Sequence, residues 1–149
     1  MEGWHGSLTR RRFLQHLGLA ATVPLVPAAQ AAPRTPIKKP IPSSGEKLPV
    51  IGLGTSRTFD AAPGAERSAL AAVLQSFFDH GGALIDSSPM YRAAEETVGE
   101  LLKVTRHGSV FAATKVWTDG KQAGIEQMER SRRLWGVPRF DLMQIHNLR

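Results

Sequence analysis

The sequence predicts an α/β fold built around a parallel sheet, and three observations carry that prediction. Short apolar runs alternate with amphipathic segments of helical length, in the order strand, helix, strand, helix, strand, helix, strand. The spacing of these segments fits βα units, in which each helix returns the chain to the same end of the sheet. Polar residues, Asp86, Lys115 and His146, stand at the ends of successive apolar runs. In parallel sheets that edge is where binding and catalytic groups gather.

Residues 1–31 are expected to be an export signal. Arg10-Arg11 leads into an apolar region from Leu17 to Ala29, and Ala29-Gln30-Ala31 has the small-residue pattern that a signal peptidase accepts. The arginine pair resembles a twin-arginine signal, which implies the twin-arginine export machinery as a partner and a periplasmic or exported location. Retention as an anchor is the alternative. The apolar region is shorter than the ~20 residues of a comfortable membrane span, so no permanent membrane anchor is expected.

The next segment is predicted to be a linker followed by a hairpin. Residues 32–36 form the linker, because prolines there block regular structure. From residue 37 to residue 53 the turn residues Ser43-Ser44-Gly45 separate two runs that bear apolar residues, a pattern typical of a β-hairpin. Residues 50–54 are expected to be a buried strand whose glycines let something large approach the backbone.

Three helices and three further strands complete the predicted order. The helices span 65–80, 95–105 and 122–135, and the third is expected to bury Ile125. Gly136 and the following proline are typical stop signals for that helix. The strands span 83–85, 110–114 and 141–145, which places Lys115 and His146 at the ends of the last two.

Composition excludes several classes of function. The 149-residue chain has no cysteine, which rules out disulfides, a thiol nucleophile and cysteine-ligated metals. The net charge of +6 is not organised into a basic stripe with interleaved aromatics, so no nucleic-acid partner is expected. The histidines lack metal-binding spacing, so no metal is expected, and no G-x-S-x-G turn accompanies Ser87 or Ser88. No complete GxGxxG follows a strand, so a Rossmann site is unsupported.

The stretch from Ala83 to Tyr91 organises the predicted site. An apolar run ends on Asp86, two hydroxyl residues and a proline follow, and Tyr91 is the only tyrosine in the chain. A tyrosine hydroxyl, with a pKa of about 10, is a poor proton donor near neutrality, whereas a nearby lysine ammonium favours the phenolate. With Lys115 held by a carboxylate and His146 orienting a carbonyl oxygen, these groups predict a proton donor for a carbonyl that becomes an alkoxide. No side chain delivers the hydride for such a reduction, so a cofactor is expected.

From about residue 37 onward the chain resembles the aldo/keto reductases. The resemblance rests on residues 51–55, 85–91, 95–99, 114–115 and 144–147. It implies the N-terminal portion of a (β/α)8 TIM barrel, with about four βα units and a β-hairpin that closes the bottom of the barrel. Residues 37–149 would form this partial domain. The resemblance also implies NADPH, or less often NADH, as the cofactor and a small carbonyl compound as the substrate.

The resemblance assigns a role to each residue of the predicted site. It makes Tyr91 the general acid, Lys115 the modulator of its acidity, Asp86 the partner of Lys115 and His146 the group that orients the substrate. The cofactor would contact Asp86 together with the turn after the first barrel strand, Gly54-Thr55. The bland interpretation is that Asp86 caps a turn and that Tyr91 packs on the surface.

Two residues depart from the family pattern. Arg92 stands where the family usually has glycine, and a charged side chain there would crowd the substrate mouth or bind an acidic substrate. Ser56 stands where relatives often have an aromatic residue, which affects the expected shape of the nicotinamide face.

The chain is also shorter than the roughly 250 residues of a complete (β/α)8 barrel. Three hypotheses follow. The first is an exported reductase represented here by its N-terminal half, which reduces an aldehyde or ketone to an alcohol with NAD(P)H. The second is a non-catalytic half-barrel remnant. The third is an exported module that binds a small anion through Arg92, Lys115 and His146.

Overall fold

The computed structural model describes residues 35–147, which belong to the compact unit Pro33–Arg149. The predicted export signal at 1–31 lies outside the described residues. No helix within the described range is long and apolar enough to cross a membrane.

The predicted hairpin is confirmed. Strand β1 (Lys38–Pro40) pairs antiparallel with β2 (Lys47–Pro49). Gly45 makes the turn with a positive φ of 74°, a conformation that glycine adopts without steric cost, and its N–H donates to the carbonyl of Ile41 at 2.8 Å.

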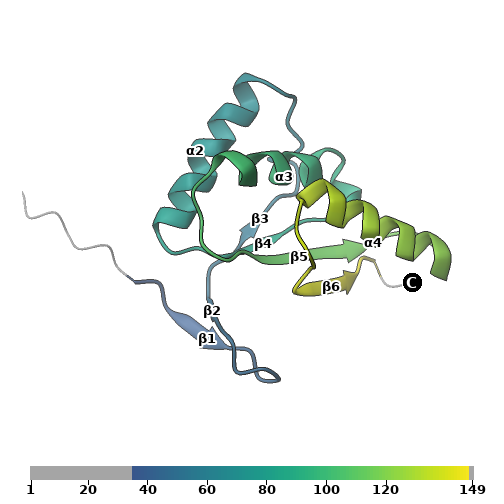
Figure 1. Cartoon of the computed structure of the whole chain (residues 1–149), viewed down its shortest axis with the longest axis horizontal. Helices are drawn as coiled ribbons and strands as arrows, with labels where there is room; N and C mark the ends of the chain where they lie inside the picture. The colour runs from purple at the N-terminus through teal and green to yellow at the C-terminus, as the bar shows by residue number, and fades with distance from the viewer. Residues whose placement is uncertain (1–34, 148–149) are drawn as a thin grey trace, which may run out of the picture. The chain divides into compact units, whose positions relative to one another are not determined.

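The predicted parallel sheet is also confirmed. It consists of β3 (Leu53–Gly54), β4 (Leu84–Asp86), β5 (Phe111–Val116) and β6 (Leu142–Ile145), side by side in chain order (Figure 1). Every neighbouring pair is parallel. The carboxyl ends of all four strands therefore meet at one edge of the sheet.

Three helices lie together on one side of this sheet (Figure 1). They are α2 (Ala65–Asp79), α3 (Ala94–Val104) and α4 (Lys121–Trp135), each within one or two residues of its predicted bounds. Helix α4 ends at Gly136, whose φ of 68° is left-handed and whose N–H reaches the carbonyls of Arg132 and Arg133.

The core lies between the helices and the middle of the sheet. Its large buried members include Leu74 of α2, Ile85 of β4 and Val98 of α3, together with Trp135 at the end of α4 and Phe59 in the loop after β3. Each such side chain contributes roughly 1.5–3 kcal/mol through burial. Helices α3 and α4 pack so closely that a Cβ on Gly99 would fall on the carbonyl group of Leu134.

The prediction of a buried strand over residues 50–54 is wrong in extent. Only Leu53–Gly54 pairs as strand, and the side chains of Val50 and Ile51 are 44% and 68% exposed. The physical reason is that β3 has a neighbour on one side only within the described residues. The expected close approach does occur at Gly52, where an added Cβ would lie 2.7 Å from the Leu84 side chain.

Two details of the later elements also differ from prediction. Strand β5 does not end before Lys115 but runs to Val116, because Lys115 and Val116 pair with Gln144 and Ile145 of β6. Ile125, predicted to be inside, is 41% exposed. Helix α4 packs through the smaller residues Gly124 and Ser131 together with Trp135, which turns Ile125 away from the core.

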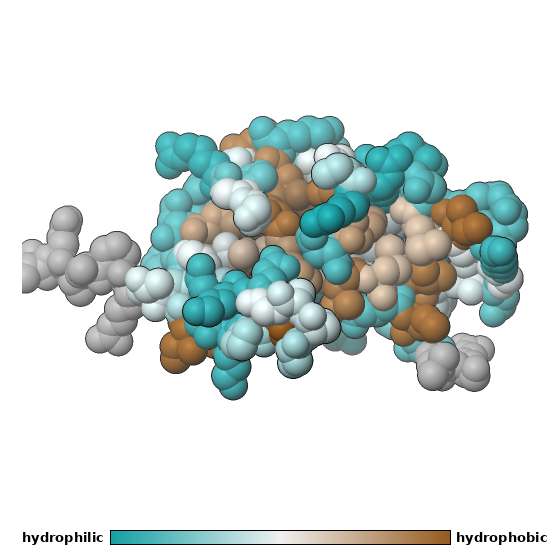
Figure 2. Space-filling view, turned by 60° about the horizontal axis from the view of Figure 1, so that its bottom comes forward, coloured by the Kyte–Doolittle hydropathy of each residue, from teal (hydrophilic) through white to brown (hydrophobic). Residues whose placement is uncertain are grey.

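Apolar side chains remain exposed at both edges of the sheet. Ile51 stands beside β3, and Leu142 and Ile145, in β6, are 43% and 72% exposed. Figure 2 shows a face on which apolar residues gather in a central area bordered by hydrophilic ones.

Candidate active site

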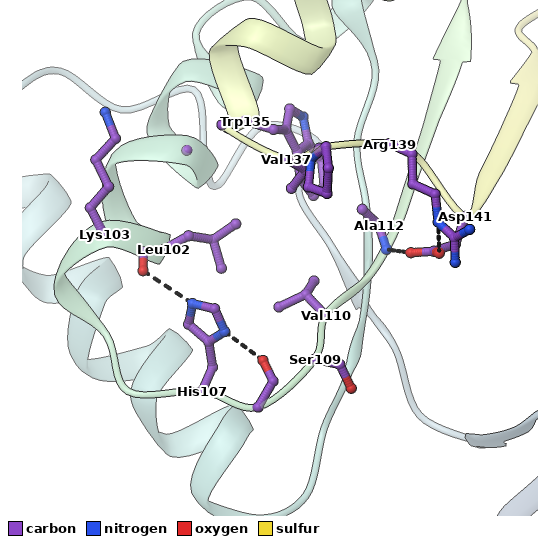
Figure 3. Close-up of a pocket in the computed structure, with 14 residues that line it drawn as sticks. Leu102, Lys103, His107, Ser109, Val110, Ala112, Trp135, Val137, Arg139 and Asp141 are labelled. Carbon is purple, nitrogen blue, oxygen red and sulfur yellow. Dashed lines mark hydrogen bonds and ion pairs between the residues drawn. The ribbon is translucent and has the colours of Figure 1, made fainter.

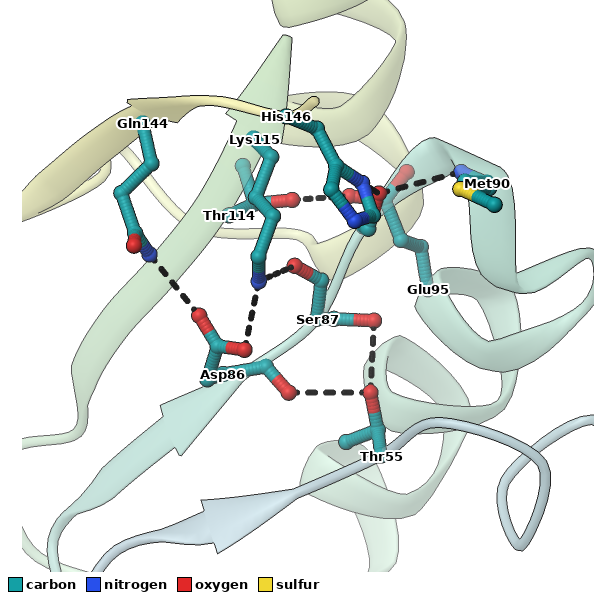
Figure 4. Close-up of polar contacts among 10 residues, drawn as sticks. Thr55, Asp86, Ser87, Met90, Glu95, Thr114, Lys115, Gln144 and His146 are labelled. Carbon is teal, nitrogen blue, oxygen red and sulfur yellow. Dashed lines mark hydrogen bonds and ion pairs between the residues drawn. The ribbon is translucent and has the colours of Figure 1, made fainter. Parts of the chain in front are cut away.

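The four residues predicted to be catalytic lie at the carboxyl ends of the strands, and Figure 4 shows three of them, Asp86, Lys115 and His146. Asp86 is the last residue of β4, Lys115 is the next-to-last residue of β5 and His146 directly follows β6. Tyr91 ends a short 3-10 helix, η2 (Pro89–Tyr91), in the loop after β4. Residues separated by as much as 60 positions in the chain are thus brought to one place by parallel strand pairing.

The ammonium group of Lys115 is held by β4. Its Nζ lies 2.5 Å from Asp86 Oδ2 and donates to the Ser87 carbonyl at 2.8 Å. The other carboxylate oxygen, Asp86 Oδ1, accepts a hydrogen bond from Gln144 Nε2 at 2.9 Å. The side chain of Lys115 is 12% exposed and that of Asp86 is 31% exposed. This ion pair is therefore largely desolvated and fixed from both neighbouring strands.

The rings of Tyr91 and His146 lie next to that ion pair. The ring of Tyr91 meets the ring of His146 edge to face, with centroids 5.6 Å apart. Lys115 Nζ lies 5.4 Å from the centroid of the Tyr91 ring. The alternative was that Asp86 caps a turn and Tyr91 packs on the surface. The Asp86 carboxylate instead bonds Lys115 and Gln144, and the Tyr91 ring lies beside the same ammonium.

A single hydroxyl orients the imidazole of His146. Ser88 Oγ lies 2.7 Å from His146 Nδ1 and accepts a hydrogen bond from the N–H of Met90 at 3.1 Å. When the Ser88 hydroxyl donates to Nδ1, the ring carries its hydrogen on Nε2. In that tautomer Nε2–H is a donor that can bind a carbonyl oxygen of a substrate.

The position of Tyr91 follows from the local sequence. Ser88 is extended, and its side chain caps η2 by accepting from Met90 N. Pro89 follows at the first position of η2, where its fixed φ favours the turn and its missing N–H costs nothing. Tyr91 is thereby held one short turn beyond the end of β4.

Gly54, the last residue of β3, and Thr55, which follows it, were both predicted to contact the cofactor, and they differ in exposure. Thr55 is fully buried, and its Oγ1 lies 3.0 Å from the Asp86 carbonyl and 2.8 Å from Ser87 Oγ. Its hydroxyl therefore ties β3 to β4. Gly54 is exposed and has no atom within 4 Å of where a Cβ would lie, so the surface beside Asp86 is open at this point.

Arg92, which stands where the family usually has glycine, has a backbone conformation that favours glycine. Its φ is 52° and its ψ is −111°, a conformation that glycine adopts far more easily than any other residue. Its guanidinium bonds Asp60 Oδ2 at 3.1 Å, and the N–H of Ala93 donates to Asp60 Oδ1 at 3.3 Å. Asp60 thus joins the loop after β3 to the loop after β4.

Sequence reasoning missed two groups of contacts. Gln144 and Ser88 lie in the segments that carry the family resemblance. Nothing in their residue type indicated that Gln144 would hold Asp86 or that Ser88 would hold His146. The period-two alternation of a strand was the available signal for Gln144, since it lies opposite Lys115 and two residues before His146. A buried cluster of Glu95, Thr114 and Ser131 was also missed.

Two cavities lie at opposite ends of the strands. One, of about 550 Å³, is lined by Trp117, Ile145 and His146 at the carboxyl ends of β5 and β6. The other, of about 520 Å³, lies near the start of β5 (Figure 3). There the ring nitrogens of His107 contact main-chain carbonyls and Arg139 pairs with Asp141. Residues 35–147 contain no group of three His, Asp or Glu that could hold a metal.

The chain belongs to the Aldo/keto reductase family, whose sequence profile matches residues 50–149. An aldo/keto reductase from Klebsiella pneumoniae, solved with NADP and acetate, is 33% identical with a TM-score of 0.60. The match covers 68% of this chain and 36% of that protein. A Klebsiella pneumoniae aldo-keto reductase solved with NADPH is 32% identical with a TM-score of 0.63, covering 74% of this chain and 39% of that one.

A candidate aldo-keto reductase from Pseudomonas aeruginosa is 26% identical with a TM-score of 0.66, covering 79% of this chain and 51% of that one. No curated protein matches the chain in sequence. The chain spans between about a third and a half of the length of these solved structures. Its fold is accordingly the N-terminal portion of a (β/α)8 barrel.

Proposed function

We propose that this chain carries the acid–base centre of an oxidoreductase that reduces an aldehyde or ketone to an alcohol with NAD(P)H. The observation that carries the proposal is the position of Lys115, bonded to Asp86 and set against the ring of Tyr91. Membership in the Aldo/keto reductase family supports the reaction class. A small carbonyl compound is the proposed substrate, and the 550 Å³ cavity beside His146 is the proposed space for it.

Each side chain has a task in this proposal. Tyr91 donates its hydroxyl proton to the oxygen of the carbonyl as that oxygen gains negative charge. The ammonium of Lys115 stabilises the phenolate that remains, and Asp86 keeps the ammonium in place. His146 donates Nε2–H to the same oxygen and so orients the carbonyl.

NADPH is the proposed cofactor, with NADH as the second choice. The two Klebsiella pneumoniae relatives were solved with NADP and with NADPH, which supports this choice. When bound, the cofactor supplies the hydride. Gly54, Thr55 and Asp86 would hold its nicotinamide end. The open surface at Gly54, next to the ion pair, fits a flat ring.

A matched pair of lysine variants tests the proposal. Lys115→Met removes the ammonium beside Tyr91, whereas Lys103→Met removes an exposed ammonium from α3. The measured quantity is the rate of NADPH oxidation with a small aldehyde. The Lys115 variant should lose roughly tenfold or more, a part of the 10²- to 10⁴-fold that general acid catalysis contributes. The Lys103 variant should match the wild type.

Equal rates for the two variants would contradict the assigned role of Lys115. Absence of NADPH-dependent reduction in the wild-type chain, with NADPH still bound, would favour the non-catalytic half barrel. The anion-binding module is disfavoured by the structure, because Lys115, Arg92 and His146 are each engaged by a partner within the protein: Asp86, Asp60 and Ser88.

We propose, separately, that residues 1–31 direct twin-arginine export to the periplasm. The support is the sequence pattern around Arg10-Arg11. Changing both arginines to lysine keeps the charge and should abolish translocation in a cell-fractionation assay. Undiminished periplasmic protein from the double variant would remove this proposal.

A further inference from the structure

A buried carboxylate, Glu95, joins three elements behind the catalytic groups and has no part in the chemistry proposed above. The residue is 2% exposed. Its Oε1 accepts a hydrogen bond from the Thr114 hydroxyl at 2.6 Å, and its Oε2 accepts one from the Ser131 hydroxyl at 2.8 Å. Burial of a carboxylate is costly unless its oxygens are bonded, so these two hydroxyls account for its place in the interior.

Glu95 connects the segments that carry Tyr91 and Lys115. It lies in the first turn of α3, four residues after Tyr91. Thr114 directly precedes Lys115 in β5, and Ser131 belongs to α4. Figure 4 shows the contact between Glu95 and Thr114 beside the groups that surround Lys115.

The alternation of a strand makes the Thr114 contact relevant to Lys115. Successive side chains of a strand point to opposite faces of the sheet. Thr114 is fully buried and bonds Glu95 of α3, so it faces the helices, and Lys115 must face the other side, where Asp86 and Gln144 lie. A hydrogen bond that fixes Thr114 therefore fixes the direction in which Lys115 leaves β5.

We propose that Glu95 is a positioning residue for the acid–base centre. Through Thr114 it sets Lys115 against Asp86 and Tyr91, and through its own place in α3 it fixes the loop that ends at Tyr91. This inference rests on the proposed function, since the position of Lys115 matters for catalysis only if Lys115 acts on Tyr91.

Two buried threonines provide a matched test. Thr114 and Thr97 are both fully buried, and Thr→Val replaces one hydroxyl by a methyl of similar size at each. The Thr114 hydroxyl bonds Glu95, whereas the Thr97 hydroxyl has no partner among the described residues. Tyr91 is the only tyrosine in the chain, so the NMR signals of isotope-labelled tyrosine report the surroundings of that one ring without any need for activity.

The reference is Lys115→Met, which removes the ammonium that lies 5.4 Å from the centroid of the Tyr91 ring and should therefore change the chemical shifts of the ring signals. Thr114→Val and Glu95→Ala should change the same signals in the same direction, because each lets the ammonium move away from the ring. Thr97→Val should leave them unchanged. Glu95→Gln should leave them close to those of the wild type, since an amide can bond both hydroxyls.

The outcomes separate this inference from the proposed function. If Lys115→Met changes the tyrosine ring signals but Thr114→Val behaves like Thr97→Val, Glu95 is not a positioning residue. If Lys115→Met itself has no effect on these signals, the contact between Lys115 and Tyr91 fails, and the proposed mechanism fails with it. Circular dichroism shows which variants are folded. Should Glu95→Ala not fold, Thr114→Val and Glu95→Gln decide the question.

Discussion

The middle of the sheet and its edges differ sharply in burial. In β4 and β5 the side chains of Ile85, Ala112 and Ala113 are at most 1% exposed. Beside β3 and in β6, Ile51 and Ile145 are 68% and 72% exposed. All four strands have similar apolar content, so composition does not explain the difference. Position does: within residues 35–147, β4 and β5 have a paired strand on each side, whereas β3 and β6 have one.

The comparison shows which part of a barrel the described residues can build alone. The ion pair between Lys115 and Asp86 belongs to the middle of the sheet, where neighbours hold it from both sides. Thr55 and His146, which extend the site, follow the edge strands. In a closed barrel each edge would pair with a further strand, and open edges with apolar residues favour association. The proposed acid–base centre is therefore the part of the site that depends least on what covers the edges.

The largest predicted change in the free energy of unfolding concerns the tight packing of α3 against α4, above the middle of the sheet. Gly99→Ala would place a methyl on the Leu134 carbonyl, so α3 and α4 would have to separate. We expect a loss of about 3 kcal/mol or more, at the upper end of what overpacking costs, measured by urea denaturation. Gly124→Ala is the control, since its Cβ would meet Val116 at an ordinary 3.6 Å. It should gain about 0.5–1 kcal/mol from helix propensity.

The second prediction compares the same substitution in the two regions. Ile85→Ala in β4 should cost about 2–5 kcal/mol, because it leaves a cavity in the packed core. Ile145→Ala in β6 should change the free energy of unfolding by no more than about 0.5 kcal/mol, because that side chain is mostly in solvent. Similar losses at both positions would show that the edge is covered in solution and that the contrast between the regions is wrong.

The smallest predicted effect concerns the link between an edge and the middle. Arg92→Gly relieves a backbone conformation that costs about 1–3 kcal/mol for a side chain. Glycine also gives the unfolded chain more conformational entropy, which lowers the free energy of unfolding by roughly 0.5–1 kcal/mol. The substitution further removes an exposed ion pair worth about 0–1 kcal/mol. A net gain of about 0.5–1 kcal/mol is expected. Arg92→Lys keeps the backbone conformation and should not gain, so equal stabilities for the two variants would contradict the strain.

Much of the fold was predictable because its signals are local. Helical periodicity and glycine stop signals placed α2, α3 and α4 to within one or two residues. Strand limits were less predictable, since they depend on partners distant in sequence. Lys115 lies inside β5 because β6 extends far enough to pair with it, and Val50 is not in a strand because β3 pairs only with β4 in the described part of the chain.

In the candidate site, too, the features with local sequence signals were predictable and those that depend on distant residues were not. Asp86, Tyr91, Lys115 and His146 could be predicted because each residue type, and its place at or soon after the end of an apolar run, are visible in the sequence. The groups that hold them could not, because Ser88 is 58 positions from His146 and Gln144 is 58 from Asp86. The burial of Glu95 could not be predicted either. In a helix rich in acidic residues, nothing in the sequence distinguishes this buried carboxylate from its exposed neighbour Glu96.

Tyr91→Phe tests the central claim, that the middle of this sheet carries the proton donor of a carbonyl reductase. The substitution keeps the ring against His146 and Lys115 and removes only the hydroxyl. NADPH-dependent reduction of an aldehyde should fall by about 10²- to 10⁴-fold, the contribution of general acid catalysis. NADPH binding, followed by fluorescence titration, should stay within about twofold, because the hydroxyl acts on the carbonyl oxygen in the transition state. Turnover close to that of the wild type would contradict the assignment of Tyr91 as the proton donor.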